Sequence, residues 1–186
     1  MYRANQNKRY RRIKRELIHK GALVDFYKDT MQVPNGNLAE WDLISHKGAA
    51  AVIPVTSNGD IIMVRQYRNP LEDFDLEIPA GSLDSPAEDP KVCAARELEE
   101  ETGCKSSHLE HLIDIYTTVA FCDEKISIYV ADHLAQAVAE MAGRCGLQDI
   151  RTFSEVFAAA RRTGGELGRM ILDGEIKDGK TVSGLL

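Results

Sequence analysis

The sequence predicts an α/β (α+β) fold with a small antiparallel β subdomain ahead of the main domain. Three observations support this prediction. Short β-rich runs separated by turn signals fill the first half of the chain, a strongly acidic helix follows near residue 90, and a helical pattern returns towards the C-terminus. A chain of 186 residues can form one substantial core with a small appended subdomain. We therefore expect a subdomain at residues 1–47 and a main domain at residues 48–186.

The composition is ordinary for a globular protein. Hydrophobic residues make up 44% and charged residues 28% of the chain, and the net charge of −6 argues against a general nucleic-acid-binding protein. No apolar run is long enough to span a bilayer and no signal-peptide pattern is present, so we expect a cytoplasmic protein with no membrane partner. The four cysteines form no CxxC pair, which favours reduced thiols over a disulfide framework or a zinc site.

The N-terminal region joins a basic stretch to a β-rich block. Six cations within residues 8–15 indicate either a solvated arm or an electrostatic contact with an anionic substrate or a partner subunit. Residues 22–27, 31–33 and 41–44 are strand-like, and the sequence PNGN at 34–37 is a strong turn signal. The block predicts a small antiparallel sheet, and a sheet of this size needs something to pack on.

The main domain begins with two predicted strands. Residues 50–55 form an apolar run typical of a strand covered on both faces, and residues 57–60 predict a hairpin turn to a partner strand at 61–64. This strand continues into RQYR, residues 65–68, where the apolar core gives way to cations.

Two arginines in that segment are candidate substrate ligands. Arg65 and Arg68 can neutralise a diphosphate, because a guanidinium group suits bidentate phosphate contacts. The alternative is a structural ion pair between one of them and Glu77 or Asp75.

An acidic helix follows a short strand at residues 76–78. Asp89 is a suitable N-cap, Pro90 suits the first helical position, and Gly103 is a suitable C-terminal stop. Strand, loop and helix together deliver the helix side chains beside the end of a strand.

Three carboxylates share one face of this predicted helix. Glu100 and Glu101 lie three and four residues after Glu97. Like charges at this spacing destabilise a helix by roughly 0.2–0.5 kcal/mol per pair, so the cluster is either a fully solvated face or a functional one. Oxygen ligands that converge on one spot suit Mg²⁺ or Mn²⁺, and Mg²⁺ usually keeps several waters and takes phosphate oxygens from a substrate.

The helix and its flanks resemble the Nudix box, GX5EX7REUXEEXGU with U aliphatic. The matching residues are the REUXEEXG segment from Arg96 to Gly103, Glu88 eight residues before Arg96, and Gly81 upstream. One departure is that six residues, not five, separate Gly81 from Glu88, and the extra residue falls in a loop where insertions are tolerated.

The resemblance implies the Nudix fold, a mixed β-sheet between helices. It also implies a metal site in which Glu97, Glu101 and the Ala80 carbonyl hold Mg²⁺ (or Mn²⁺), with Glu100 as a third ligand or part of a second metal site. Arg96 would orient its neighbours, in part through Glu88.

Other segments resemble the ADP-ribose pyrophosphatase branch of this family. These are RQYR at 65–68, LEIPAG at 76–81 and GEIKDGKT at 174–181. In that branch the N-terminal β block is exchanged across a homodimer, which predicts a homodimer here. The branch also places a phosphate-contacting arginine at the position of Arg68. Trp41 could stack on a base, although a single tryptophan is also a common core residue. The expected substrate-binding residues are Arg68, Arg65, Glu77 and Trp41.

The region after the box predicts strands at 112–116 and 126–131 with a loop between them. Phe121-Cys122-Asp123-Glu124 resembles a family loop with a further acidic residue, which makes Glu124 a candidate catalytic base or metal ligand. The alternative is a solvated carboxylate, and this loop has Val119-Ala120 where the family usually has Pro-Gly.

Further along, the pattern predicts a helix, a strand and another helix. The helix covers residues 134–142, the strand covers 149–153, and the second helix starts at Thr152 or Ser154 and runs through Ala160 or beyond. A helical pattern resumes over 167–172.

The expected function is Mg²⁺-dependent hydrolysis of ADP-ribose, or a related nucleoside diphosphate sugar, to AMP and ribose 5-phosphate. The candidate catalytic residues are Glu100, Glu101, Glu124 and Arg96. Two alternatives stay open: a Nudix hydrolase for another nucleotide sugar such as GDP-mannose, and a non-catalytic module that binds ADP-ribose as a sensor. The complete REUXEEXG segment argues against the sensor, and the net charge argues against a nucleic-acid module.

Overall fold

The computed structural model describes residues 9–136 and 160–186, which divide into two compact units. Among the described residues, unit 1 comprises residues 9–47 and 116–124, and unit 2 comprises residues 48–115, 125–136 and 160–186. The predicted division into residues 1–47 and 48–186 remains a prediction. In the ranges that the structure describes, no helix has the length and apolar character needed to cross a membrane.

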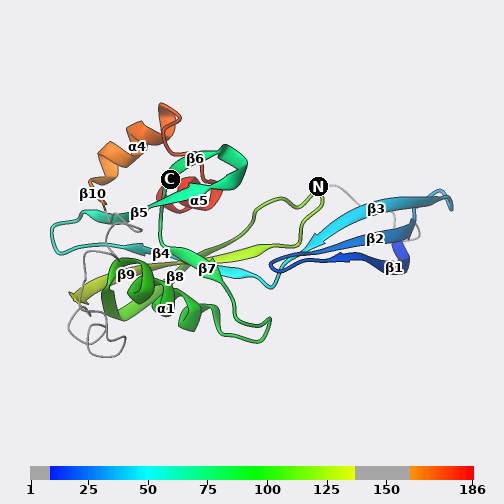
Figure 1. Ribbon diagram of the computed structural model, residues 1–186, viewed down its shortest axis with the longest axis horizontal. Coiled ribbons are helices and arrows are strands. Elements are labelled where there is room, and N and C mark those ends of the chain that lie inside the picture. Colours follow the sequence, from blue (N-terminus) through cyan, green and yellow to red (C-terminus); the bar gives the residue numbers. More distant parts are fainter. Residues whose placement is uncertain (1–8, 137–159) are drawn as a thin grey trace. The chain divides into compact units, whose positions relative to one another are not determined.

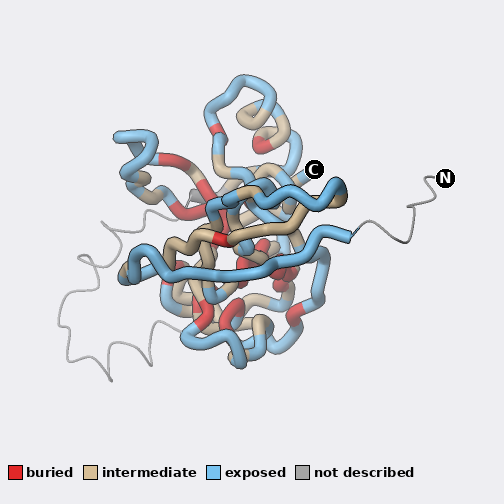
Figure 2. The backbone as a smooth tube through the Cα atoms, turned by 90° about the vertical axis from the view of Figure 1, so that its right-hand side faces the viewer, coloured by how far each residue is buried: buried red, intermediate tan, exposed pale blue. Residues whose placement is uncertain are grey.

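Unit 1 is built on a three-stranded antiparallel sheet. Its strands are β1 (Arg11–Lys20), β2 (Asp25–Gln32) and β3 (Leu38–Ser45), in the order β1-β2-β3 (Figure 1). The predicted turn at 34–37 joins β2 to β3, where Gly36 has a φ of 92° and the Asn35 side chain accepts a hydrogen bond from the Asn37 N–H. Among the described residues of this unit, Asp29 alone is buried. Figure 2 accordingly draws the strands of this unit mostly in the colours for exposed and intermediate residues.

The expected basic arm is wrong from Arg11 onward, because this stretch forms β1. Its backbone pairs with β2 along the whole strand, yet all ten of its residues are exposed. A strand held by backbone hydrogen bonds without burial has no hydrophobic alternation, so the sequence pattern does not reveal it.

Unit 2 contains a mixed sheet and a smaller antiparallel one. The mixed sheet has the order β7-β4-β9-β8, and its strands are β4 (Ala49–Pro54), β7 (Ala80–Ser82), β8 (Cys104–Tyr116) and β9 (Lys125–Gln136). Strand β4 runs antiparallel to β7 and parallel to β9. The smaller sheet has the order β10-β5-β6, from β5 (Ile61–Arg68), β6 (Asp73–Glu77) and β10 (Ala160–Arg162), and a short 3-10 helix (Asn69–Leu71) joins β5 to β6.

Strand β4 lies at the centre of the core, and all six of its residues are buried. Ala50 and Val52 face helix α1 (Pro90–Thr102) and pack with its Cys93, Ala94 and Leu98. The alternate residues Ala49, Ala51 and Ile53 pack on the other side with Met63 of β5 and Leu167 of helix α4 (Gly164–Leu172), where helix α5 (Gly179–Leu185) also docks through Val182 and Leu185. Figure 1 shows α1 on one face of the mixed sheet and α4 and α5 on the other. The predicted α/β architecture, a mixed sheet between helices, is confirmed.

Two local predictions are wrong. Strand β9 continues through Gln136, so residues 134–136 are strand where a helix was expected, and the rest of that helix lies outside the described residues. Ala160 opens strand β10 instead of continuing a helix, because residues 160–162 pair with β5. Such pairing joins segments about a hundred residues apart and leaves no local signal. The strand predicted at 149–153 also lies outside the described residues.

Candidate active site

The capping residues of α1 fix where the helix begins and ends, and so fix which way its acidic face points. The Asp89 side chain accepts a hydrogen bond from the Lys91 N–H, Pro90 occupies the first turn, and Gly103 takes the left-handed conformation with a φ of 67° and donates its N–H to the Glu99 carbonyl. Both predicted helix ends are confirmed. Between them, Leu98 packs into the core while Glu97 and Glu101 lie one turn apart on the side that faces β7.

Gly81 on β7 makes room for the first of these glutamates. The side chain of Glu97 is buried against it, and a Cβ added at position 81 would lie 2.0 Å from the Glu97 Oε1. No side chain fits at this position while the carboxylate stays where it is. The glycine of the box is therefore required by the close approach of helix and strand.

Glu101 is held from two directions. Its Oε2 accepts a hydrogen bond from the Ala80 N–H at 3.0 Å, and its Oε1 accepts one from Gln66 Nε2 at 3.3 Å. Burial raises the pKa of Glu101 to about 7, and the Ala80 hydrogen bond only partly offsets this effect. Burial also raises the pKa of Glu97, against the influence of Arg96. Burial thus raises the pKa values of two neighbouring carboxylates, although Arg96 pairs with Glu97.

Arg96 contacts several acidic side chains at the outer side of the helix. Its Nη1 donates to Glu97 Oε1 at 2.5 Å and to Glu100 Oε2 at 3.4 Å, and its Nη2 lies 3.7 Å from Glu88 Oε1. The Glu100 side chain is 54% exposed, so it lies at the rim of the acidic face.

The extra loop residue before Glu88 is absorbed by a local turn. The Asp84 N–H donates to Glu88 Oε2 at 2.5 Å, and the Glu88 N–H donates to the Ser85 carbonyl at 3.0 Å. Glu88 therefore stays within reach of Arg96 despite the six-residue spacing.

The predicted metal ligands are gathered, but they do not form a ready-made coordination shell. Glu97, Glu101 and Ala80 lie at the contact of α1 with β7, with Glu100 beside them. Across residues 9–136 and 160–186, no three His, Cys, Asp or Glu side chains are arranged to hold a metal ion as they stand. Arg96 pairs with one of the two carboxylate oxygens of Glu97.

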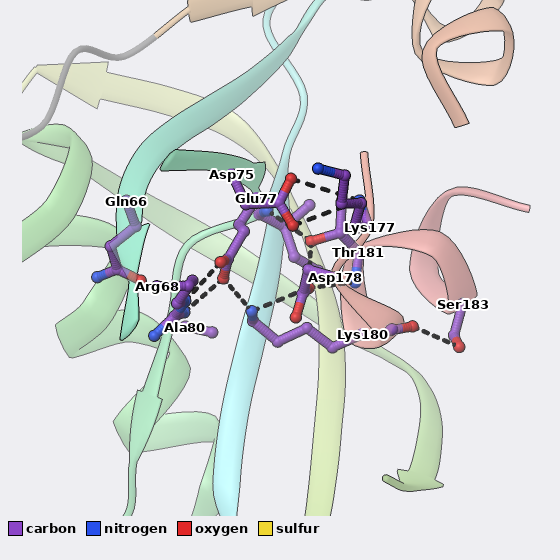
Figure 3. Close-up of polar contacts among 12 residues, drawn as sticks. Gln66, Arg68, Asp75, Glu77, Ala80, Lys177, Asp178, Lys180, Thr181 and Ser183 are labelled. Carbon is purple, nitrogen blue, oxygen red and sulfur yellow. Dashed lines mark hydrogen bonds and ion pairs between the residues drawn. The ribbon is translucent and has the colours of Figure 1, made fainter. Parts of the chain in front are cut away.

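Arg68 and Glu77 belong to a second, partly buried charge cluster (Figure 3). Arg68 donates from Nε to Glu77 Oε1 and from Nη2 to Glu77 Oε2, both at 2.5 Å, so the structural ion pair left open by the sequence is formed. Glu77 is 1% exposed and also accepts a hydrogen bond from Lys180 Nζ, which in turn lies 2.9 Å from Asp178 Oδ2.

Sequence reasoning missed Gln66 and Lys180. Gln66 precedes Arg68 by two residues on β5, which puts both side chains on one face of the strand, and that spacing is the signal that could have found it. Lys180 lies in the GEIKDGKT segment, and the resemblance of that segment to the ADP-ribose pyrophosphatase branch is the signal that could have found it.

Arg65 does not join this cluster. It alternates with Gln66 and Arg68 along β5 and lies exposed, with its guanidinium carbon 4.6 Å from the centre of the Phe74 ring. The strand therefore directs Arg65 to the opposite face from Arg68.

Trp41 and Glu124 belong to unit 1. Trp41 is 46% exposed with its ring 5.7 Å from that of Tyr10, so it is not a core residue of this unit. Glu124 accepts a hydrogen bond from Thr117 Oγ1 at 2.8 Å and lies 3.5 Å from His46 Nδ1.

Several known proteins resemble this chain. The model of the NUDIX domain matches residues 45–155. The chain is 46% identical over 124 residues to the methanol dehydrogenase activator of Bacillus methanolicus, and 42% identical over 123 residues to the ADP-ribose pyrophosphatase of Bacillus subtilis. These matches cover 67% and 66% of this chain, and 66% of each relative's own length.

A solved structure shares the fold. The crystal structure of an ADP compounds hydrolase superposes with a TM-score of 0.76 at 20% sequence identity, covering 99% of this chain and 93% of that one. The domain match extends over more than half of the chain and includes the whole acidic helix. The chain belongs to the Nudix family.

Proposed function

We propose that this protein hydrolyses the diphosphate bond of ADP-ribose, or of a closely related nucleoside diphosphate sugar, with Mg²⁺ as the cofactor. The observation that carries this proposal is the pair of buried carboxylates, Glu97 and Glu101, packed where Gly81 leaves room for them. The name of the Bacillus subtilis relative supports ADP-ribose as the substrate.

The residues present fit a divalent cation. Burial raises the pKa values of both carboxylates even though Arg96 pairs with Glu97, and oxygen donors are the ligands that Mg²⁺ prefers. Glu97, Glu101 and the Ala80 carbonyl would hold the ion, with Glu100 as a further ligand. When bound, it would neutralise the diphosphate and lower the pKa of a coordinated water.

The reaction breaks one P–O bond of the diphosphate and forms another to a water oxygen. The water gives its proton to a carboxylate, for which Glu100 and Glu101 are the candidates in unit 2. Arg68 donates hydrogen bonds to Glu77 on one side. It would bind the diphosphate and stabilise the charge that develops on the leaving phosphate. Arg96 would keep Glu97 and Glu100 in place before the cation binds.

The test is release of AMP from ADP-ribose by the purified protein, with Mg²⁺, with a chelator, and with Glu101→Gln. Release that needs Mg²⁺ and collapses in the variant is the expected result. Binding of ADP-ribose without release would instead support a sensor. No binding and no release would direct the search to other nucleotide sugars, such as GDP-mannose, by product analysis.

We also propose that the protein is a homodimer. Large apolar side chains are exposed on the unit 1 sheet, and such patches are typical of interaction surfaces; they are Tyr10, Ile13, Leu17, Ile18, Leu38 and Trp41. Light scattering on a sizing column is expected to give twice the mass of one chain. Ile13→Lys combined with Leu17→Lys is expected to shift the protein towards the monomer.

A further inference from the structure

We infer that Lys180 is a positioning residue: through Glu77 it holds the guanidinium of Arg68 in the orientation that binds the substrate diphosphate. This inference rests on the proposed function and assigns a role within the same site.

Glu77 is the group through which Lys180 would act. It is 1% exposed, its Oε1 accepts from Arg68 Nε, and its Oε2 accepts from both Arg68 Nη2 and Lys180 Nζ (Figure 3). Burying a carboxylate this deeply is costly unless cations pair with it, and Arg68 and Lys180 both do so. An ionised carboxylate is also the form that accepts both hydrogen bonds of an arginine fork.

The buried ammonium group is costly unless it is paired. The Lys180 side chain is 8% exposed and lies between two carboxylates, Glu77 and Asp178. Arg68, Glu77, Lys180 and Asp178 thus form a row of alternating charge with no net charge. If Lys180 lost its charge, both carboxylates would act on Arg68 as the remaining cation, and the guanidinium would be drawn away from the substrate.

Backbone and side-chain contacts fix Lys180 in register with Glu77. Asp178 caps α5 by accepting hydrogen bonds from the Thr181 N–H at 2.8 Å and from Thr181 Oγ1 at 2.6 Å. Thr181 is fully buried, and its Oγ1 accepts the N–H of Ile78 at 3.1 Å. Thr181, the residue after Lys180, is therefore tied to Ile78, the residue after Glu77, which leaves the ammonium group little freedom.

The outer side of Arg68 is open to a ligand. Its side chain is 40% exposed, and Nη1 makes no hydrogen bond to any part of the chain that the structure describes. The negative charge of Glu101 also acts on Arg68, so the guanidinium lies between the Glu77 cluster and the acidic face of α1. Nη1 is the nitrogen left for a phosphate oxygen.

The experiment is a double-mutant cycle between Lys180 and Arg68. The wild type, Lys180→Met, Arg68→Ala and the double variant are compared for the kcat and KM of ADP-ribose hydrolysis and for ADP affinity by calorimetry. Lys180→Met is expected to raise KM and weaken ADP binding ~10-fold or more, in the range of one charged hydrogen bond, with a smaller change in kcat. In the Arg68→Ala background it is expected to add less than about twofold, because the residue through which it acts is gone.

A matched control tests whether loss of any nearby lysine has the same effect, and a second variant replaces Lys180→Met if that variant does not fold. Lys177→Met removes an exposed lysine three residues earlier and is expected to leave KM unchanged. Circular dichroism checks folding; if Lys180→Met does not fold, Lys180→Gln, which keeps a hydrogen-bond donor without the charge, replaces it in the same cycle.

Two results would overturn the inference: an unchanged KM and ADP affinity in the Lys180 variant, or a loss of equal size with and without Arg68. Failure of the proposed function looks different, because the wild type then releases no AMP from ADP-ribose. In that case ADP affinity alone decides the inference, and a wild type that binds no ADP also overturns it.

Discussion

At position 81 the chain has no side chain, and the Glu97 carboxylate occupies the space that a Cβ would fill. Gly81→Ala is therefore expected to displace Glu97 and to lower kcat/KM for ADP-ribose by ~100-fold or more, the range reported for misplacement of a catalytic group by about 1 Å. Steady-state kinetics at saturating Mg²⁺ measure this effect.

A matched glycine separates this effect from helix or loop stability. A Cβ at Gly168 in α4 would meet nothing within 4 Å, so Gly168→Ala is expected to keep full activity and to add up to about 1 kcal/mol of helix stability. An active Gly81→Ala enzyme would show that Glu97 can act from another position.

Local spacing predicts some site residues and misses others. Glu97 and Glu101 share a face because of helical periodicity alone, and Asp89 and Gly103 fix where that helix begins and ends. Gln66 and Lys180 reach the site through strand pairing and through packing of α5, which depend on distant segments. Sequence periodicity carries no information about such contacts.

At the scale of an element, α5 docks closely on the core because residue 184 is glycine. A Cβ there would lie 3.2 Å from Ile53 Cδ1 and 3.4 Å from Ile128 Cγ2. Gly184→Val is expected to lower the free energy of unfolding by ~1–3 kcal/mol through overpacking, as measured by urea denaturation. The control Gly179→Ala, where a Cβ would meet nothing within 4 Å, is expected to change stability little; equal losses in both variants would contradict the packing explanation.

The pairing of β1 with β2 has a pH-dependent component. Arg15 donates two hydrogen bonds of 2.7 Å to Asp29, and they hold the pKa of Asp29 below its usual value of 3.8. A lowered carboxylate pKa stabilises the folded state above the unfolded value and loses this contribution as the pH falls through the folded value. Asp29→Asn is therefore expected to lower Tm near pH 7, and this deficit is expected to shrink as the pH falls below about 4. Thermal melts from pH 7 to pH 3 test this, and a constant deficit would contradict it.

Strand prediction from the sequence is wrong where a strand pairs with its neighbour but its side chains stay exposed. The six residues of β4 are all buried, and the sequence predicts a strand at residues 50–55. The ten residues of β1 are all exposed, and the basic stretch at residues 8–15, which includes the first half of β1, is predicted as an arm. The hydrophobic pattern of a sequence indicates which residues are buried. A strand that pairs through its backbone without burying side chains has no such pattern.

At the scale of the whole molecule, a bound cation is expected to stabilise the fold by mass action. Mg²⁺ at ten times its dissociation constant contributes ~1.4 kcal/mol, which raises Tm by about 3–6 °C for a chain of this size. Calorimetry with and without chelator measures the shift. A variant carrying Glu97→Gln and Glu101→Gln is expected to show none at matched ionic strength, and a shift that persists there would place the cation elsewhere.

The bond from Lys180 to Glu77 and the one from Ile78 to Thr181 each join residues 103 positions apart. Contacts of such long sequence separation bear a large loop-closure entropy and form slowly. The acidic helix can form from local contacts. The contacts that hold Arg68 through Glu77 form only after the segments around Glu77 and Lys180 have come together. During refolding from denaturant, ADP-ribose hydrolysis is therefore expected to return later than helical circular dichroism, so a chain with native secondary structure can still lack a working site.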